Sequence, residues 1–190
     1  MNAIPEHRMT VDEFLEWAKA QPGRYELFDG RIVAMSPERV GHAEAKGRVY
    51  RALGDAISKS QLPCTVLPDG ATVRVDARTT YEPDSLVYCG QKLDDDAIEV
   101  PNPIIIVEVL SPSTQYIDLG AKLAGYFQIP SVVHYLLVTP GNAPIIHHQR
   151  QADGNILTRL AHADPVTLDP PGLTFDPPGL TFDVADVLPA

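Results

Sequence analysis

One run in the hydrophobic pattern of the chain stands out, because it contains a single charge. Six of the seven residues at 104–110 are apolar and most are β-branched, and prolines stand at positions 103 and 112. This pattern predicts a strand that is buried on both faces. The seventh residue is Glu108. A buried carboxylate without a partner costs more than a domain's whole stability, so we expect Glu108 to be protonated, hydrogen-bonded, paired with a cation or bound to a metal.

Along the rest of the chain, the spacing of hydrophobic residues indicates helices in some segments and strands in others. A capping box from Thr10 to Glu13 begins a short amphipathic helix. Asp29-Gly30 lies between two short β-type runs and predicts the turn of a hairpin. The same reasoning predicts further helices at residues 42–60 and 118–127, and further strands at residues 65–67, 72–75, 85–88, 132–138, 145–148 and 155–160.

The third predicted helix connects the buried strand to the strand at residues 132–138. A crossover of this length implies a parallel, right-handed unit, whereas the hairpin implies antiparallel pairing. The length of 190 residues suits one domain with a real core. We therefore expect a single α/β domain over residues 1–190, with a central mixed sheet, flanking helices and a core at about residues 10–165.

The C-terminal segment, residues 166–190, contains a literal repeat. The seven residues at 169–175 recur directly at 176–182. A unit of this length copied once is too short to build a solenoid. We interpret the repeat as a tandem duplication in a tolerant terminus, of which only one copy docks.

Composition and charge limit the possible functions. The net charge is −10, with 25 acidic against 15 basic residues, which argues against broad electrostatic attachment to nucleic acid. Carboxylates that hold divalent cations, however, add negative charge themselves. No apolar run approaches the ~20 residues of a membrane span and residues 1–8 do not resemble a secretory signal, so we expect a soluble, cytoplasmic protein. Cys64 and Cys89 have no metal-ligand or redox spacing and are expected to be free thiols.

Three ionisable residues are candidates for chemistry: Asp84 before one predicted strand, Glu108 inside another, and Lys122 on the helix that follows. If the two strands are neighbours, the two carboxylates lie close together. Carboxylate oxygens suit Mg²⁺ or Mn²⁺, which bind substrate phosphates and promote phosphodiester hydrolysis. Taken singly, Asp84 could be a turn or cap residue, and Lys122 could form a surface pair with Asp118 four residues earlier.

An ordered set of short motifs also runs through the chain. The set comprises Tyr25-Glu26-Leu27 with Asp29-Gly30, Met35-Ser36-Pro37, His42, Pro83-Asp84, Glu108-Val109-Leu110-Ser111-Pro112-Ser113-Thr114, Asp118, Lys122 and Tyr126. Over about residues 10–140 this order resembles the Uma-type endonuclease family of the PD-(D/E)XK nuclease superfamily. The resemblance implies a restriction-endonuclease-like fold and an Mg²⁺-dependent DNA endonuclease, with Mn²⁺ as a substitute, DNA as the substrate and a homodimer as the assembly.

The resemblance also implies roles for single residues. Asp84 and Glu108 would be metal ligands, and the backbone carbonyl of Val109 would be a third. The superfamily's usual lysine would fall at position 110, which is Leu110. Lys122 on the following helix would take its place, orienting the attacking water or screening the phosphate.

Two further residues resemble parts of the family's site. Glu26 corresponds to an additional acidic residue near the metal, although a glutamate in a hairpin could equally be solvated. His42 lies near the start of a helix, where it would meet a phosphate. His147 and His148 point to opposite faces of any strand and are not expected to form a site. Residues 129–140 depart from the family pattern. This weakens the resemblance at the far edge of the sheet more than at the proposed metal site.

Two other functions remain open from the sequence. A restriction-endonuclease-like module that binds or regulates without catalysis is favoured by the net charge of −10 and by the missing lysine at position 110. A metal-dependent hydrolase of another phosphoester would use the same ligands and differ only in its substrate.

Overall fold

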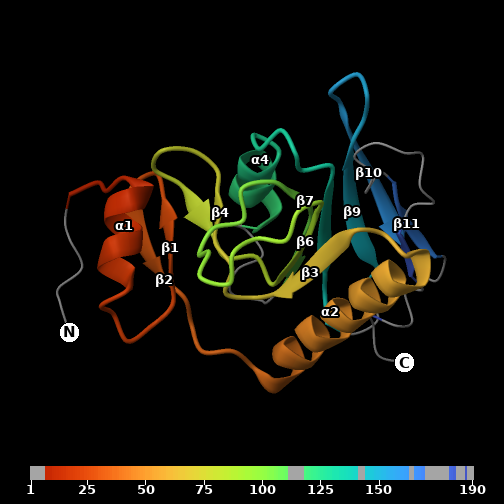
Figure 1. Cartoon of the computed structure of the whole chain (residues 1–190), viewed down its shortest axis with the longest axis horizontal. Coiled ribbons are helices and arrows are strands. Elements are labelled where there is room, and N and C mark those ends of the chain that lie inside the picture. Colours follow the sequence, from red (N-terminus) through yellow and green to blue (C-terminus); the bar gives the residue numbers. More distant parts are fainter. Residues whose placement is uncertain are drawn as a thin grey trace.

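The computed structural model describes residues 7–110, 118–140, 144–162, 165–169, 180–182 and 187. At the centre of this part of the chain lies a six-stranded mixed sheet (Figure 1). Its strands, in spatial order, are β10 (Ile156–Ala161), β9 (Ile145–Arg150), β8 (His134–Val138), β7 (Pro103–Val109), β6 (Ser85–Cys89) and β3 (Cys64–Pro68). The predicted central mixed sheet is confirmed.

The buried strand predicted at residues 104–110 is β7, and every residue of β7 is buried. It pairs antiparallel with β6 and parallel with β8, as the predicted crossover requires. The connection to β8 contains a π-helical turn, η1 (Asp118–Lys122), followed by α4 (Leu123–Tyr126). The third helix is therefore present, but it begins with π geometry. The predicted strand break at residues 111–114 lies outside the described residues.

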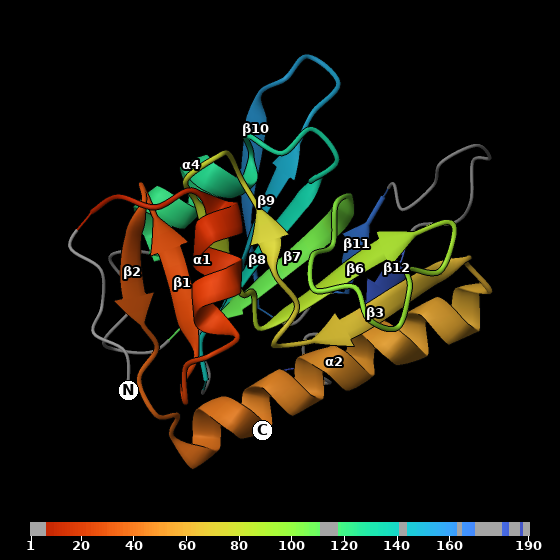
Figure 2. The same cartoon turned by 60° about the vertical axis from the view of Figure 1, so that its left-hand side comes forward.

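Helices pack on the six-stranded sheet from both sides. The long helix α2 (Val40–Ser60) runs along one face, as Figures 1 and 2 show, and its Val49 and Leu53 share an apolar cluster with Ile105 and Val107 of β7. On the other face, Tyr126 of α4 belongs to a second apolar cluster. Each fully buried aliphatic side chain contributes about 1.5–3 kcal/mol, so β7 is fixed from both faces. Within the described ranges, no helix has the length and apolar character that a membrane crossing requires.

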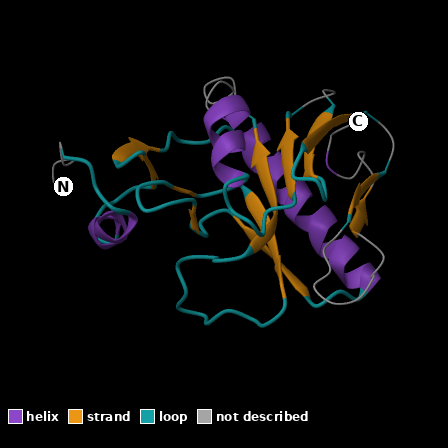
Figure 3. Ribbon diagram, turned by 90° about the horizontal axis from the view of Figure 1, so that it is seen from above, coloured by secondary structure: helices purple, strands orange, loops and turns teal. Residues whose placement is uncertain are grey.

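A smaller sheet lies at the N-terminal end of the molecule with α1 (Val11–Ala18), away from the C-terminal strands (Figure 3). Its strands, in spatial order, are β2 (Arg31–Ala34), β1 (Tyr25–Phe28), β5 (Thr80–Tyr81) and β4 (Val73–Arg74). The capping box of Thr10 and Glu13 is present. Asp29 and Gly30 have φ of 47° and 74°, as a type I′ hairpin turn needs. Both local predictions are confirmed, whereas the two-residue β5 is too short for a pattern to predict.

After β3 the chain crosses from the six-stranded sheet to the smaller sheet and back again. It leaves the six-stranded sheet after β3, at Asp69, and returns to it before β6, at Asp84. Because Pro68 and Ser85 are partners in the antiparallel β3–β6 pair, the two crossings begin side by side. Two aspartates distant in sequence are thereby brought to one junction.

The second copy of the C-terminal repeat contributes a strand. β12 (Leu180–Phe182) pairs antiparallel with β11 (Val166–Leu168), which joins the apolar cluster on the α2 side of the sheet. Most of the first copy, residues 170–175, lies outside the described residues, so the prediction that only one copy docks is not tested.

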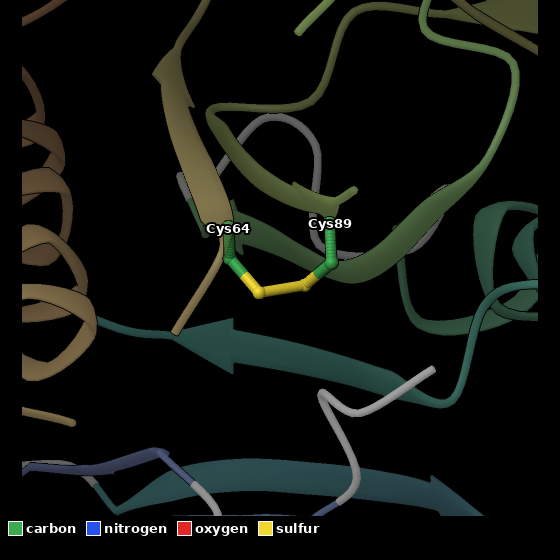
Figure 4. Close-up of a disulfide and its surroundings, with 2 residues drawn as sticks. All are labelled: Cys64 and Cys89. Atoms are coloured by element: carbon green, nitrogen blue, oxygen red, sulfur yellow. A yellow bond between two sulfur atoms is a disulfide. The ribbon is translucent and has the colours of Figure 1, made fainter. Parts of the chain in front are cut away.

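The expectation of two free thiols is wrong, because Cys64 and Cys89 form a disulfide (Figure 4). The two cysteines are direct partners in the antiparallel β3–β6 pair. Their separation of 25 residues carries no motif, and only the strand register brings the sulfurs together. The disulfide joins the two strands whose other ends lead into Asp69 and Asp84.

Candidate active site

The start of β6 and the end of β7 lie side by side. Ser85 and Val107 are register partners, so Asp84 reaches the end of β7. The backbone N–H of Val109 donates to Asp84 Oδ2 at 2.6 Å. Asp84 is therefore tied to the main chain directly after Glu108, as expected of neighbouring strands. The two carboxylates nevertheless have different lysine partners.

Glu108 is paired with a cation and hydrogen-bonded, two of the four arrangements that its burial predicts. Its Oε1 accepts from the Tyr126 hydroxyl at 2.6 Å and from Lys122 Nζ at 2.9 Å. Lys122 is only 6% exposed, so its side chain does not lie on the surface as the helical spacing allowed. Its Nζ lies 5.3 Å from the centre of the Tyr81 ring. The structure thus brings Glu108 and Lys122 together inside the protein.

Glu26 joins the same buried group from the N-terminal hairpin. Lys122 Nζ donates to Glu26 Oε1 at 2.9 Å, and the backbone N–H of Glu82 donates to the same oxygen at 2.9 Å. The Glu26 side chain is 12% exposed, so the solvated alternative does not apply. Burial and the neighbouring Glu108 carboxylate raise the pKa of Tyr126 well above its usual value, and burial raises the pKa of Tyr81 to about 12. Both phenols therefore remain neutral at physiological pH.

Asp84 has a second cation partner on α2. Lys46 Nζ lies 2.8 Å from Asp84 Oδ1 and 2.8 Å from Asp69 Oδ2, and it is closer still to Glu38 Oε1. Lys46 is buried, with 8% of its surface exposed. Three carboxylates from three different segments thus converge on one ammonium group.

An arginine completes this second group. Arg24 donates to Asp69 Oδ2 at 2.7 Å and to Glu82 Oε2 at 2.9 Å. Burial opposes the charges of Lys46 and Asp69, but nearby opposite charges outweigh it. Asp84 and Asp69 raise the pKa of Lys46, and Lys46 and Arg24 lower the pKa of Asp69. Lys46 and Asp69 therefore stay ionised at neutral pH.

Glu38, Asp69 and Asp84 have the donor set of a metal site. One oxygen from each residue can be chosen so that all three oxygens lie within 4.8 Å of one another. Among the described residues, this is the one acidic group that meets this condition. Oxygen-only ligands with excess negative charge suit Mg²⁺ or Mn²⁺. The residues present therefore fit a divalent cation, and Asp84 is the member of this group that the sequence predicts.

His42 connects α2 to the end of β7. Its Nε2 lies 2.6 Å from the carbonyl oxygen of Val109, so in the Nε2–H tautomer it donates to the carbonyl expected to bind the metal. The same ring nitrogen lies 3.9 Å from Asp84 Oδ2, and Nδ1 lies 3.8 Å from Glu38 Oε2. The structure brings His42 into the site; its expected contact with a phosphate stays a prediction.

A pocket opens beside the acidic group. It has a volume of about 310 Å³, and its lining consists of Arg24, Met35, Ser36, Pro37 and Glu38. The motif Met35-Ser36-Pro37 therefore forms part of its wall, next to two residues of the ion-pair network.

Four residues of the site lie outside the sequence prediction, namely Arg24, Glu38, Lys46 and Asp69. Two weak signals were available. Pro68-Asp69 repeats the dipeptide of Pro83-Asp84. Lys46 also follows His42 by four residues, which places both side chains on one face of α2. Neither signal identifies a partner, because the partners come from the crossings between the two sheets.

His147 and His148, which the sequence did not assign to a site, lie on β9. His147 Nε2 is 2.9 Å from His134 Nδ1 on one side of the sheet, and His148 Nδ1 is 2.8 Å from the Thr158 hydroxyl. Burial, with smaller effects of Arg159 and His148, lowers the pKa of His147 to about 4. These residues bear on stability and do not contact the acidic group.

Comparison with solved structures defines the class of fold. The chain aligns with the crystal structure of a "putative nuclease belonging to DUF820" from Anabaena variabilis ATCC 29413, with a TM-score of 0.66 and 14% identity. The alignment covers 86% of this chain and 89% of that chain. Identity at this level shows the fold alone: the mixed α/β fold, with its central mixed sheet, flanking helices and N-terminal helix and hairpin, is shared with this structure.

Sequence comparison then gives the family. Residues 11–184 match Uma2, described as "Putative restriction endonuclease", and the chain belongs to this family. Two relatives come from Synechocystis sp. (strain ATCC 27184 / PCC 6803 / Kazusa). "Uncharacterized protein slr1290" is 27% identical over 156 residues, covering 82% of this chain and 81% of the relative. "Uncharacterized protein sll1609" is 26% identical over 155 residues, covering 80% and 87%.

Proposed function

We propose that the protein is a divalent-metal-dependent DNA endonuclease that hydrolyses phosphodiester bonds. The observation that carries the proposal is the group of Glu38, Asp69 and Asp84, whose oxygens suit a divalent cation. The group lies beside a pocket of about 310 Å³ that is open to a substrate. Membership of the Uma2 family, described as "Putative restriction endonuclease", supports DNA as the substrate.

The proposed cation ligands are Asp84 and Glu108 with the Val109 carbonyl, joined by Glu38 and Asp69. A bound Mg²⁺ or Mn²⁺ would polarise a phosphoryl oxygen of the substrate and lower the pKa of a bound water. Glu108 Oε1 and the Val109 carbonyl already accept hydrogen bonds from protein donors, so an ion held by these oxygens would compete with those donors.

The protein's own cations serve the phosphate and the attacking water. Lys122, held between Glu26 and Glu108, is a buried ammonium that can orient a water beside Glu108. His42 stands at the first turn of α2, where a released imidazole N–H can donate to a phosphate oxygen. Arg24 lines the pocket and keeps its charge, so it favours an anionic substrate there.

The test is cleavage of supercoiled plasmid DNA by the purified full chain with Mg²⁺, with Mn²⁺ and with EDTA. We expect nicking or linearisation that EDTA abolishes, and loss of cleavage in Asp84→Asn and Glu108→Gln. Glu44→Gln and Asp55→Asn are matched controls, because both are exposed carboxylates on α2. Cleavage by the site variants at the wild-type rate would sink the assignment.

The same assay separates the other two functions. Hydrolysis of a simple phosphodiester such as bis(p-nitrophenyl) phosphate, without action on DNA, would indicate a hydrolase of another substrate. Calorimetric titration with Mn²⁺ that shows no binding, together with no hydrolysis, would indicate a binding or regulatory module. Each result contradicts the endonuclease proposal in a different way.

A homodimer is proposed as the assembly, supported by the edge strand β10. Ile156, Leu157 and Leu160 on this strand are 38%, 38% and 59% exposed. A two-fold antiparallel pairing centred on Thr158 would set Ile156 opposite Leu160 of the second copy, burying both. Light scattering after gel filtration is the test: we expect a dimer for the wild type and a monomer for Leu160→Lys. A wild-type monomer at high concentration would remove the proposal.

The cytoplasm is proposed as the location, since the proposed substrate is DNA. Cell fractionation tests the location: we expect the chain to be recovered with the cytoplasmic fraction. Recovery with the membrane or secreted fraction would contradict it.

A further inference from the structure

Lys46 occupies the centre of the acidic group. Its ammonium nitrogen lies 2.8 Å from an oxygen of Asp69 and 2.8 Å from an oxygen of Asp84, and it also contacts Glu38. These are the same three carboxylates whose oxygens lie close enough together to hold one metal ion. The ammonium therefore takes the position that a shared cation would need.

A divalent cation and this ammonium cannot use the three oxygens at once. Mg²⁺ binds carboxylate oxygens at roughly 2.1 Å, well inside the hydrogen-bonding distance of an ammonium group. Two positive groups this close in a partly buried site also repel each other strongly. One must leave when the other binds.

We propose that Lys46 is a tethered counterion: it neutralises Glu38, Asp69 and Asp84 in the ion-free protein, and a divalent cation must displace it to bind. The proposal rests on the proposed metal site. Lys46 would then be a reversible counterion, which releases the three carboxylates when the metal binds. A permanent structural ion pair would not release them, and a metal ligand would contact the metal itself.

The surroundings allow this exchange. Lys46 has a long, flexible stem, and its contact Glu38 lines the open pocket, so the ammonium has a direction in which to move. Arg24 by contrast is fixed by Asp69 and by Glu82. A displaced Lys46 ammonium would face the pocket, where it can meet a substrate phosphate. Ion binding and phosphate binding would then be linked through one side chain.

The experiment measures Mn²⁺ binding by the full chain in calorimetry, without DNA. Lys46→Met removes the competing charge and keeps most of the stem, Lys46→Arg keeps the charge, and Lys59→Met is the control in the exposed last turn of α2. We expect Lys46→Met to bind Mn²⁺ about tenfold tighter or more, because the ion no longer breaks charged hydrogen bonds. Lys46→Arg should bind no tighter than the wild type, and Lys59→Met should match it.

A second measurement needs no variant and guards against a Lys46→Met protein that fails to fold. Amine acetylation of the wild type, read by mass spectrometry, should become faster at Lys46 when Mn²⁺ is added and stay unchanged at Lys59. Unchanged or slower acetylation of Lys46, or a folded Lys46→Met that binds Mn²⁺ no tighter than the wild type, overturns the proposal. If Mn²⁺ displaces Lys46 but the protein does not cleave DNA, the counterion proposal holds and the proposed nuclease function is wrong.

Discussion

Asp84 Oδ2 accepts the backbone N–H of Val109 at 2.6 Å, so the side chain before β6 is locked to the main chain directly after Glu108. This bond links the two halves of the site. On one side lies the group of Glu108, Lys122 and Glu26, and on the other lies the group around Lys46. Changes on either side should therefore affect chemistry and stability together.

Asp84→Asn tests the link directly. The amide keeps an acceptor for the Val109 N–H but loses the negative charge that attracts Lys46 and the proposed cation. We expect DNA cleavage to fall by about 100-fold or more, because a charged ligand is lost. The far-ultraviolet circular dichroism should remain that of the wild type. Rates from plasmid nicking, compared with Asp55→Asn, give the measurement; equal rates for both variants would contradict the role of Asp84.

Tyr126→Phe isolates one hydrogen bond inside the protein. Tyr126 is fully buried, and its hydroxyl donates to Glu108 at 2.6 Å. Removing the donor should lower the free energy of unfolding by about 1–3 kcal/mol, because a buried charged acceptor loses a partner. Urea denaturation measures this change in the free energy of unfolding. Tyr50→Phe is the matched control, since Tyr50 is 41% exposed and should change stability by less than about 0.5 kcal/mol.

The buried histidine pair predicts loss of stability in mild acid. Burial lowers the pKa of His147 from its usual value of 6.5 to about 4 in the folded protein. The unfolded chain therefore binds more protons between these values, so the contribution to stability is complete above pH 6.5 and is lost as the pH falls toward 4. The difference corresponds to up to about 3 kcal/mol.

Urea melts at a series of pH values test the histidine prediction. Arg159 on β10 and His148 on β9 add to the effect of burial in lowering the pKa of His147, and Nδ1 of His134 on β8 lies 2.9 Å from its Nε2. His147→Gln should flatten the pH dependence between 6.5 and 4, whereas His162→Gln, at an exposed position, should leave it unchanged. A wild type equally stable at pH 7 and pH 4.5 would argue against a neutral buried pair.

Reduction of the disulfide should destabilise the fold. Cys64 and Cys89 close a loop with a separation of 25 residues, for which the loss of a disulfide costs about 2–4 kcal/mol. Dithiothreitol should lower the midpoint of thermal unfolding of the wild type and have no effect on the Cys64→Ser/Cys89→Ser double variant. Two thiols that react with Ellman's reagent in denatured, unreduced protein would show that the bond is absent.

Features set by local chemistry could be predicted from the sequence. The period of residues 104–110 identified β7 and its one buried carboxylate, and Asp29-Gly30 identified the hairpin because few residues adopt its backbone angles. The neighbouring strands were expected to bring Asp84 close to Glu108, whereas the expectation that Lys122 lies at the site came from the family resemblance and not from spacing. The strand and the hairpin need only local periodicity and turn chemistry.

Features set by long-range crossings could not be predicted. Asp69 and Lys46 meet because the chain leaves the six-stranded sheet after β3 while α2 packs across the same edge, and neither event has a local signature. The Cys64–Cys89 bond likewise follows from the register of β3 on β6. Helical spacing even suggested a surface position for Lys122, since the pattern does not show that the helix begins with a π turn against the sheet.

The most direct test of the account is a crystal structure of the full chain soaked in Mn²⁺, with the ion located by its anomalous scattering. The account predicts one strong peak, at roughly 2.2 Å from an oxygen of Asp84 and from oxygens of other proposed ligands, namely Glu108, the Val109 carbonyl, Asp69 or Glu38. It also predicts a Lys46 ammonium that has moved away from Asp84. A structure without such a peak, with Lys46 still bound to all three carboxylates at millimolar Mn²⁺, would contradict it.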